Sequence, residues 1–137
     1  MIEVACAIIV NPDKQVLVAQ RSAAMKMPLK MEFPGGKVEP GENAAGCLIR
    51  EIKEELNLLV CPVFEMEANI HRYPDFTIKL IPFICTITSG ELVLKEHIAC
   101  YWADLEMLYG LDWAEADILI MKNYLAGNYW RKKVNLH

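Results

Sequence analysis

The stretch from Val4 to Val10, VACAIIV, is an unbroken run of seven apolar residues. A strand with one face in solvent alternates apolar and polar side chains, so a continuous apolar run predicts a strand buried on both faces. A sheet that contains such a strand needs a covering layer on each side. This run therefore constrains the fold more than any other feature of the sequence.

The remaining patterns indicate what the covering layers are. Further strand-like runs occur at residues 15–21, 31–33, 58–70, 77–88 and 98–105. Helical periodicity occurs at residues 43–56 and 114–125. A turn at residues 11–14 predicts a hairpin of the first two strands, and Pro34-Gly35-Gly36 predicts a break. This order predicts one domain, residues 1–137, folded as an α/β (α+β) sandwich with a mixed sheet between helices.

Composition argues against several classes of partner. The chain is 54% hydrophobic and 23% charged, an ordinary globular balance, and its formal net charge is −4. It lacks the basic footprint of a protein that binds nucleic-acid polymers, and residues 131–133, RKK, are interpreted as a solvated tail. No run approaches the roughly 20 apolar residues that span a bilayer, and we expect no secretory signal. The oligomeric state is left open.

Cysteine usage bears on the compartment. The five cysteines are Cys6, Cys47, Cys61, Cys85 and Cys100. Their number is odd, their spacing is wide and no CxxC pair occurs, unlike a disulfide framework or a zinc site. We interpret them as small buried apolar residues in a reducing compartment, which predicts a cytoplasmic protein.

Three carboxylates share one face of the first predicted helix. With Leu48 at zero on a helical wheel, Glu54, Glu51 and Glu55 fall at about 240°, 300° and 340°, and the apolar stripe spans about 0–100°. The sequence thus places the acids opposite the core. A solvated acidic face, partnered by Arg50 and Lys53, is the alternative interpretation.

The residues just before this helix favour a metal site. Gly35-Gly36 and a Pro-Gly turn allow backbone conformations and close approaches that side chains would block, and Glu42 adds another acid at the helix entrance. Clustered carboxylate oxygens suit hard cations such as Mg²⁺, with Mn²⁺ as a second candidate. A cation would also relieve the repulsion between the carboxylates.

These residues resemble the Nudix box, G-x5-E-x7-R-E-U-x-E-E-x-G-U with U aliphatic. Eight of its nine specified positions are matched here, by Gly36, Glu42, Arg50, Glu51, Ile52, Glu54, Glu55 and Leu58. The ninth, normally glycine, is Asn57. Asparagine tolerates positive φ, so we expect the left-handed end of the helix to survive the exchange.

The resemblance implies roles for the box and for one residue outside it. Glu51, Glu54 and Glu55 would bind Mg²⁺ with help from a carbonyl of Gly35 or Gly36, and Arg50 would orient a box glutamate, most simply Glu42. Glu51 is one candidate base for the attacking water. Glu96 resembles the additional glutamate that some members supply as ligand or base, although an exposed loop acid is the alternative.

Within the family, AQRS…EFPGGKVEPGE resembles the MutT-like branch, and EHIACYWADLEML is similar to its cytidine-type members. The branch includes oxidised-purine nucleotide triphosphatases and CTP or modified-cytidine pyrophosphohydrolases. This likeness implies that Arg21 contacts phosphates, that Phe33 lines a base pocket and that Asp117 recognises the base. The alternatives are core packing for Phe33 and helix-start capping for Asp117.

The resemblance implies hydrolysis of a nucleoside triphosphate, by water attack on phosphorus, to a nucleoside monophosphate and pyrophosphate. Hydrolysis of dinucleotide polyphosphates or nucleotide sugars is an alternative within the same chemistry. An alternative of another class is a catalytically silent nucleotide-sensing module, although such modules typically lose box carboxylates and all are present here. The preferred base and the number of metals remain open.

Overall fold

The apolar run forms the centre of a five-stranded mixed sheet. In the computed structural model, which describes residues 1–127, strand β1 (Ile2–Ile9) pairs antiparallel with β4 (Gly35–Lys37) and parallel with β7 (Thr77–Gly90). Strand β7 also pairs with β5 (Leu58–Glu65) and β6 (Asn69–Arg72), both antiparallel. Both edges of β1 are therefore occupied.

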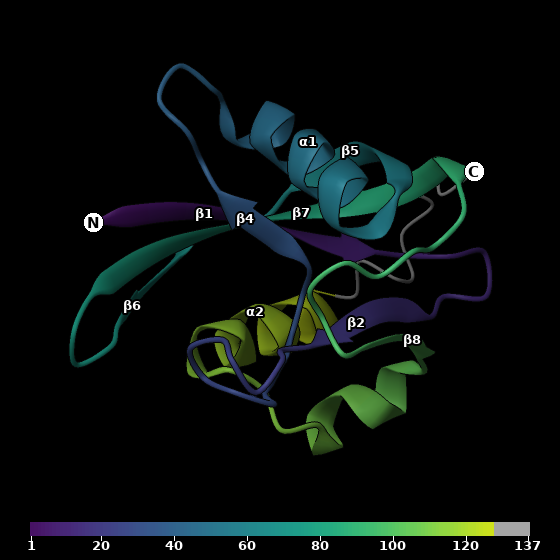
Figure 1. Cartoon of the computed structure of the whole chain (residues 1–137). Helices are drawn as coiled ribbons and strands as arrows, with labels where there is room; N and C mark the ends of the chain where they lie inside the picture. The colour runs from purple at the N-terminus through teal and green to yellow at the C-terminus, as the bar shows by residue number, and fades with distance from the viewer. Residues whose placement is uncertain (128–137) are drawn as a thin grey trace.

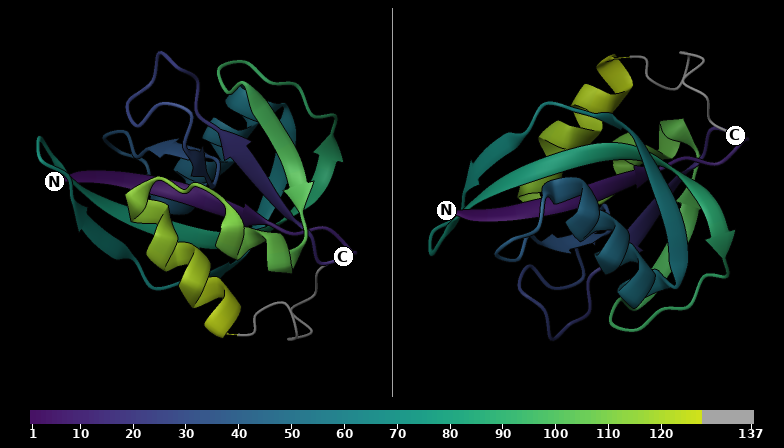
Figure 2. Two further views of the ribbon diagram at one scale, coloured as in Figure 1. Left: turned by 90° about the horizontal axis from the view of Figure 1, so that it is seen from below. Right: turned by 90° about the horizontal axis from the view of Figure 1, so that it is seen from above.

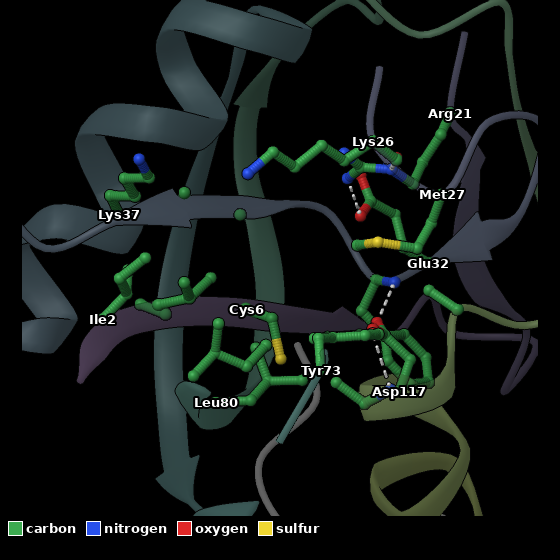
Figure 3. Close-up of a pocket in the computed structure, with 18 of the residues that line it drawn as sticks. Ile2, Cys6, Arg21, Lys26, Met27, Glu32, Lys37, Tyr73, Leu80 and Asp117 are labelled. Carbon is green, nitrogen blue, oxygen red and sulfur yellow. Dashed lines mark hydrogen bonds and ion pairs between the residues drawn. The ribbon is translucent and has the colours of Figure 1, made fainter. Parts of the chain in front are cut away.

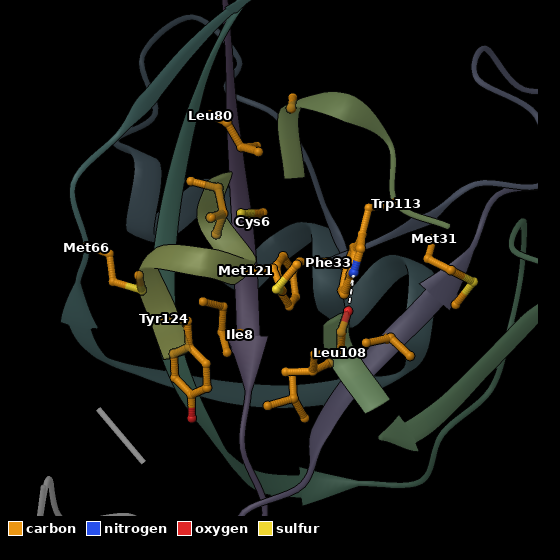
Figure 4. Close-up of a cluster of buried hydrophobic side chains, with 14 of the residues drawn as sticks. Cys6, Ile8, Met31, Phe33, Met66, Leu80, Leu108, Trp113, Met121 and Tyr124 are labelled. Carbon is orange, nitrogen blue, oxygen red and sulfur yellow. Dashed lines mark hydrogen bonds between the residues drawn. The ribbon is translucent and has the colours of Figure 1, made fainter. Parts of the chain in front are cut away.

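A helix covers each face of this sheet. Alternate side chains of the run enter two separate cores: Ala5, Ala7 and Ile9 pack on the side of α1 (Ala44–Leu56), and Cys6, Ile8 and Val10 on the side of α2 (Glu115–Ala126). Figures 1 and 2 show the two helices on opposite sides of β1, and Figure 4 shows the core beside α2. The predicted mixed sheet between helices is confirmed.

A second, three-stranded sheet lies beside the first. Its central strand β2 (Val16–Gln20) pairs antiparallel with β3 (Met31–Glu32) and β8 (Ala99–Ala103). A 3-10 helix, η1 (Leu105–Gly110), follows β8. The predicted hairpin of the first two strands is wrong, because β1 and β2 share only an isolated bridge before they enter different sheets. The edge of β1 opposite β7 is taken at Val4–Cys6 by β4, and β2 pairs with β3 and β8 in the other sheet.

Other predicted boundaries also change. The run at residues 58–70 divides into β5 and β6, and Gly35-Gly36 pairs with β1 as part of β4 where the sequence suggested a break. Not every cysteine is buried: Cys61 is exposed and Cys100 is half-buried, and all five are free thiols. The cluster at residues 131–133 lies outside the described residues. None of the helices within residues 1–127 is long and apolar enough to cross a membrane.

Both ends of α1 are held by asparagines. Asn43 Oδ1 accepts a hydrogen bond from the backbone N–H of Gly46 at 2.7 Å, a typical N-cap. Asn57 ends the helix with φ 59° and ψ 32°, which confirms the predicted left-handed conformation. Its side chain accepts from Lys53 Nζ at 3.1 Å and donates to the carbonyl of Glu91 at 3.0 Å. The start of the helix is thus set locally, whereas its end also depends on a contact with Glu91, 34 positions along the chain.

We predict that Asn57→Ala destabilises the protein by about 1 kcal/mol more than Asn57→Gly does. Both variants lose the two side-chain hydrogen bonds, but only alanine keeps a Cβ in a left-handed conformation. Urea unfolding of the three proteins measures the difference. Equal free energies of unfolding for the two variants would contradict the proposed strain at this helix end.

Candidate active site

The acidic side chains of α1 lie against β4. Glu51 is close to Gly36, where an added Cβ would collide with the Glu51 side chain. The expectation that the acids lie opposite the core is wrong for two of them: Glu51 and Glu55 are half-buried, and only Glu54 is exposed. The reason is that β4 packs against this side of the helix, with Gly36 in contact with the Glu51 side chain.

One guanidinium connects the acids. Arg50 Nε and Nη2 each donate to one oxygen of Glu42 at 2.8 Å, the bidentate geometry that suits a planar fork. Arg50 Nη1 donates to Glu51 at 3.0 Å and to Glu54 at 3.2 Å. The hydrogen bonds from Arg50 are the main cause that lowers the pKa of Glu42 to about 2. The same contacts raise the pKa of Arg50.

The negative charges of Glu51 and Glu55 are less well compensated than that of Glu42. Burial raises the pKa of Glu51, although Arg50 partly offsets it. Burial, and then the nearby charge of Glu96, raise the pKa of Glu55. Glu55 Oε2 is buried and, among the described residues, has no hydrogen-bond partner. An uncompensated buried carboxylate oxygen is a place where a cation would be bound favourably.

These residues fit a hard divalent cation in chemistry, but their side chains are not yet arranged around one. The carboxylates and the glycine carbonyls supply oxygen donors, which suit Mg²⁺. Within residues 1–127, however, no three His, Cys, Asp or Glu side chains converge on one point as a ligand set. Arg50 accounts for part of this, since it holds Glu51 and Glu54 toward itself. Binding of a cation would require those two carboxylates to turn toward Glu55.

A cavity of about 280 Å³ begins at Gly35 and Gly36 and runs along β1 to α2 (Figure 3). Gly35, Gly36 and Lys37 line one part of it, and Asp117 lines another. Arg21, Phe33 and further residues of both sheets also line it. The structure therefore brings together on one cavity the glycines of the box and three residues that the sequence assigned to a ligand.

Asp117 is a buried carboxyl in the first turn of α2. It is 6% exposed, and its Oδ2 accepts the backbone N–H of Phe33 at 2.9 Å (Figure 3). It does not cap the helix: Ala114 is the N-cap residue, and the Tyr73 hydroxyl accepts the first-turn N–H of Ala116 at 3.0 Å. Burial, and then the charge of Glu32, raise the pKa of Asp117 well above its ordinary value. A carboxyl that is easily protonated can donate as well as accept a hydrogen bond.

Phe33 and Arg21 differ in how far they are available to a ligand. Phe33 is buried and packs on Trp113 with ring centroids 4.7 Å apart, yet it also lines the cavity, so both of its predicted roles are compatible with its position. Arg21 Nη1 pairs with Glu32 at 2.6 Å, and its Nε donates to the carbonyl of Lys26. A phosphate would have to compete with these partners for the guanidinium.

Two residues of this region were not identified from the sequence, Glu32 and His97. Glu32 lines the cavity, and its Oε2 lies 2.6 Å from His97 Nε2. They are 65 positions apart, and no spacing motif connects them. Glu96, the neighbour of His97, is exposed, but its charge acts on Glu55, so it lies near the acidic helix.

Comparison with known proteins finds relatives along nearly the whole chain. The NUDIX domain model matches residues 2–123. The CTP pyrophosphohydrolase of Escherichia coli (strain K12) is 33% identical over 126 residues, which cover 92% of this chain and 93% of that protein. The 8-oxo-dGTP diphosphatase of the same organism is 30% identical over 116 residues, covering 85% of this chain and 90% of that protein.

Solved structures agree on the fold. The solution structure of the E. coli ORF135 protein has a TM-score of 0.81 and 32% identity, covering 97% of this chain and 94% of that chain. The crystal structure of the MutT protein from Methanosarcina mazei Go1 has a TM-score of 0.84 at 24% identity, covering 93% and 95% of the two chains. The second likeness concerns the fold alone.

We predict that alanine at Gly35 destabilises the protein more than alanine at Gly36. In Gly35→Ala the new Cβ meets the backbone of Ala5. That backbone cannot move without breaking the pairing of β4 with β1, so the free energy of unfolding should fall by about 3 kcal/mol. In Gly36→Ala it meets the side chain of Glu51, which can rotate away, so the loss should be smaller.

The control is Gly110→Ala, where the added Cβ meets nothing within 4 Å. Urea unfolding should rank the three variants in the order Gly110, Gly36 and Gly35, from most to least stable. A Gly35→Ala protein as stable as Gly110→Ala would show that β4 does not approach β1 this closely.

Proposed function

This chain belongs to the Nudix family, and we propose that it hydrolyses nucleoside triphosphates to nucleoside monophosphates and pyrophosphate. Its relatives are named as pyrophosphohydrolases and diphosphatases, which are hydrolases of phosphoric anhydride bonds. The observation that carries the proposal is the cavity that joins the box glycines to the buried Asp117. It offers one compartment for phosphates and base together.

Nudix hydrolases generally need a divalent metal; we propose Mg²⁺, for which Mn²⁺ can substitute. Glu51, Glu54 and Glu55 would hold it, with a carbonyl of Gly35 or Gly36 and with Glu96 as a further ligand. The unpartnered Glu55 Oε2 supports this assignment. When bound, the cation would neutralise polyphosphate charge and activate a water.

Arg50 has a positioning role in this proposal. Its bidentate pairing fixes the Glu42 carboxylate near the start of the helix. Its remaining contacts hold the Glu51 and Glu54 carboxylates. The attacking water needs a base, and Glu51 and Glu96 are the candidates. Glu51 is half-buried beside Gly36 and Glu96 is exposed, so Glu51 is the better shielded of the two.

The other part of the cavity would receive the base. Phe33 would line the face of the ring. Asp117 would bind its edge, since the carboxyl is buried on the cavity wall and its Oδ2 accepts the N–H of Phe33. Arg21 would contact the phosphates after exchanging its pairing with Glu32. Cytidine nucleotides and oxidised purine nucleotides are the proposed substrates, following the names of the two relatives.

A neighbouring cavity favours a second candidate substrate. It measures about 410 Å³, shares Lys26, Tyr73 and Phe76 with the first, and is also lined by Lys30 and Trp113. Aromatic rings and ammonium groups together suit a second nucleoside with its phosphate. Dinucleotide polyphosphates are therefore the alternative to a simple triphosphate.

We further propose that residues 1–137 form a single domain that acts in the cytoplasm on small nucleotides. The absence of disulfides among the five cysteines is consistent with a reducing compartment. The acidic net charge of −4 disfavours binding to nucleic-acid polymers.

A nucleotide screen with magnesium tests the function. Canonical and oxidised nucleoside triphosphates and diadenosine tetraphosphate are each incubated with the protein, and pyrophosphate and orthophosphate are measured separately. We expect pyrophosphate from triphosphates, with cytidine or oxidised purine nucleotides preferred and no turnover without the divalent cation. Orthophosphate as the first product from triphosphates would contradict the proposal.

The matched variant in this screen is Asp117→Asn. Its amide oxygen can still accept the N–H of Phe33, so the fold should hold, but the group can no longer be protonated or carry charge. The ranking of bases should change while the magnesium requirement stays. An unchanged ranking would remove Asp117 from base recognition and leave the hydrolase assignment intact.

A further inference from the structure

His97 is a buried histidine that none of the roles assigned above uses. Its side chain is only 6% exposed, and its Nε2 lies 2.6 Å from Glu32 Oε2. The segment that carries it is fixed immediately afterwards, because Ile98 N–H donates to the carbonyl of Gln20 at 3.2 Å and β8 then pairs with β2. The imidazole is therefore held at a defined place beside β3.

The Glu32 carboxylate is held from two sides. Arg21 Nη1 binds Oε1 at 2.6 Å (Figure 3), and His97 Nε2 binds Oε2 at 2.6 Å. Glu32 also lines the cavity, and its charge acts on Asp117. With one partner on each oxygen, the carboxylate can be neither rotated nor withdrawn without losing a hydrogen bond. Arg21 alone would leave one oxygen free to turn.

The second nitrogen of His97 argues against a role in packing alone. An ionised carboxylate can only accept, so Nε2 carries the proton that is donated to Glu32. Nδ1 is buried and, within the described part of the chain, has no partner. An unsatisfied buried nitrogen costs stability that an apolar side chain of similar size would avoid. The benefit that offsets this cost is the hydrogen bond to Glu32.

His97 also lies near the acidic helix. Burial and the charge of Glu96 raise the pKa of Glu55, and the charge of His97 acts on it in the opposite direction. Glu96 and His97 therefore both lie within electrostatic range of Glu55, while His97 also binds Glu32, a residue of the cavity wall. His97 therefore binds the cavity wall at Glu32 and also lies near the acidic helix at Glu55.

We propose that His97 is a positioning residue for nucleotide specificity: it fixes the Glu32 carboxylate on the cavity wall, where Glu32 presents a hydrogen-bond acceptor to the N–H groups of a base. This inference rests on the proposed function only in taking the cavity to be the nucleotide site. Loss of the imidazole N–H would leave Glu32 Oε2 without this partner, so the carboxylate could turn about its contact with Arg21. Recognition of the base would then weaken more than turnover of bound substrate.

The test compares His97→Met with His97→Gln, which have similar size but differ in the N–H donor. Binding of CMP and GMP is measured without metal by calorimetry, and KM and kcat are measured with the best triphosphate of the screen. His97→Met should weaken binding of the preferred monophosphate about tenfold and raise KM more than it lowers kcat. His97→Gln should recover most of the loss. Thermal unfolding checks that both variants fold.

A double-mutant cycle with Glu32→Gln shows whether His97 acts through Glu32. If it does, the double variant binds the monophosphate about as weakly as the worse single variant, because the two changes remove one interaction. Additive losses, or a His97→Met protein with unchanged binding and KM, would overturn the inference. If wild type binds a monophosphate but turns over no nucleotide, the proposed function fails while the cycle still decides the role of His97. If it binds neither monophosphate, the inference fails as well.

Discussion

The site depends on the position of β4, which lies close to β1 on one side and to α1 on the other. Gly35 lies against the backbone of Ala5, and Gly36 lies against the side chain of Glu51; a Cβ at either position would occupy space already filled. Because β1 is the central strand, this contact fixes the acidic helix relative to both cores. It also places the Glu51 side chain next to Gly36, which lines the cavity.

The electrostatics of that contact are balanced only in part. Arg50 compensates Glu42 well, and the pKa of Glu42 falls to about 2. Burial raises the pKa values of Glu51 and Glu55. A group whose pKa is higher in the folded than in the unfolded protein stabilises the fold at low pH, and that contribution is lost as pH rises from its ordinary pKa through the raised one. At neutral pH these two carboxylates therefore oppose folding, and a bound cation would relieve that penalty.

Local patterns predicted much of this from the sequence. The apolar run gave a strand buried on both faces, helical periodicity gave α1 within one residue, and Asn57 took the predicted left-handed conformation. Contacts between distant residues could not be predicted. The pair Glu32–His97 and the separation of β1 from β2 depend on which strands occupy which edges, and no local pattern encodes that choice. The burial of Glu51 and Glu55 was missed because a wheel cannot show how a neighbouring strand covers a helix.

We propose above all that Glu55, which is half-buried and whose Oε2 has no hydrogen-bond partner within residues 1–127, binds a divalent cation. The most direct measurement is the melting temperature of wild type, Glu55→Gln and the exposed control Glu67→Gln, each with and without magnesium. Without magnesium, Glu55→Gln should melt no lower than wild type, since it removes one of the crowded charges. Magnesium should raise the melting temperatures of wild type and Glu67→Gln by mass action, and that of Glu55→Gln clearly less. Equal magnesium shifts in all three proteins, or none in wild type, would contradict the claim.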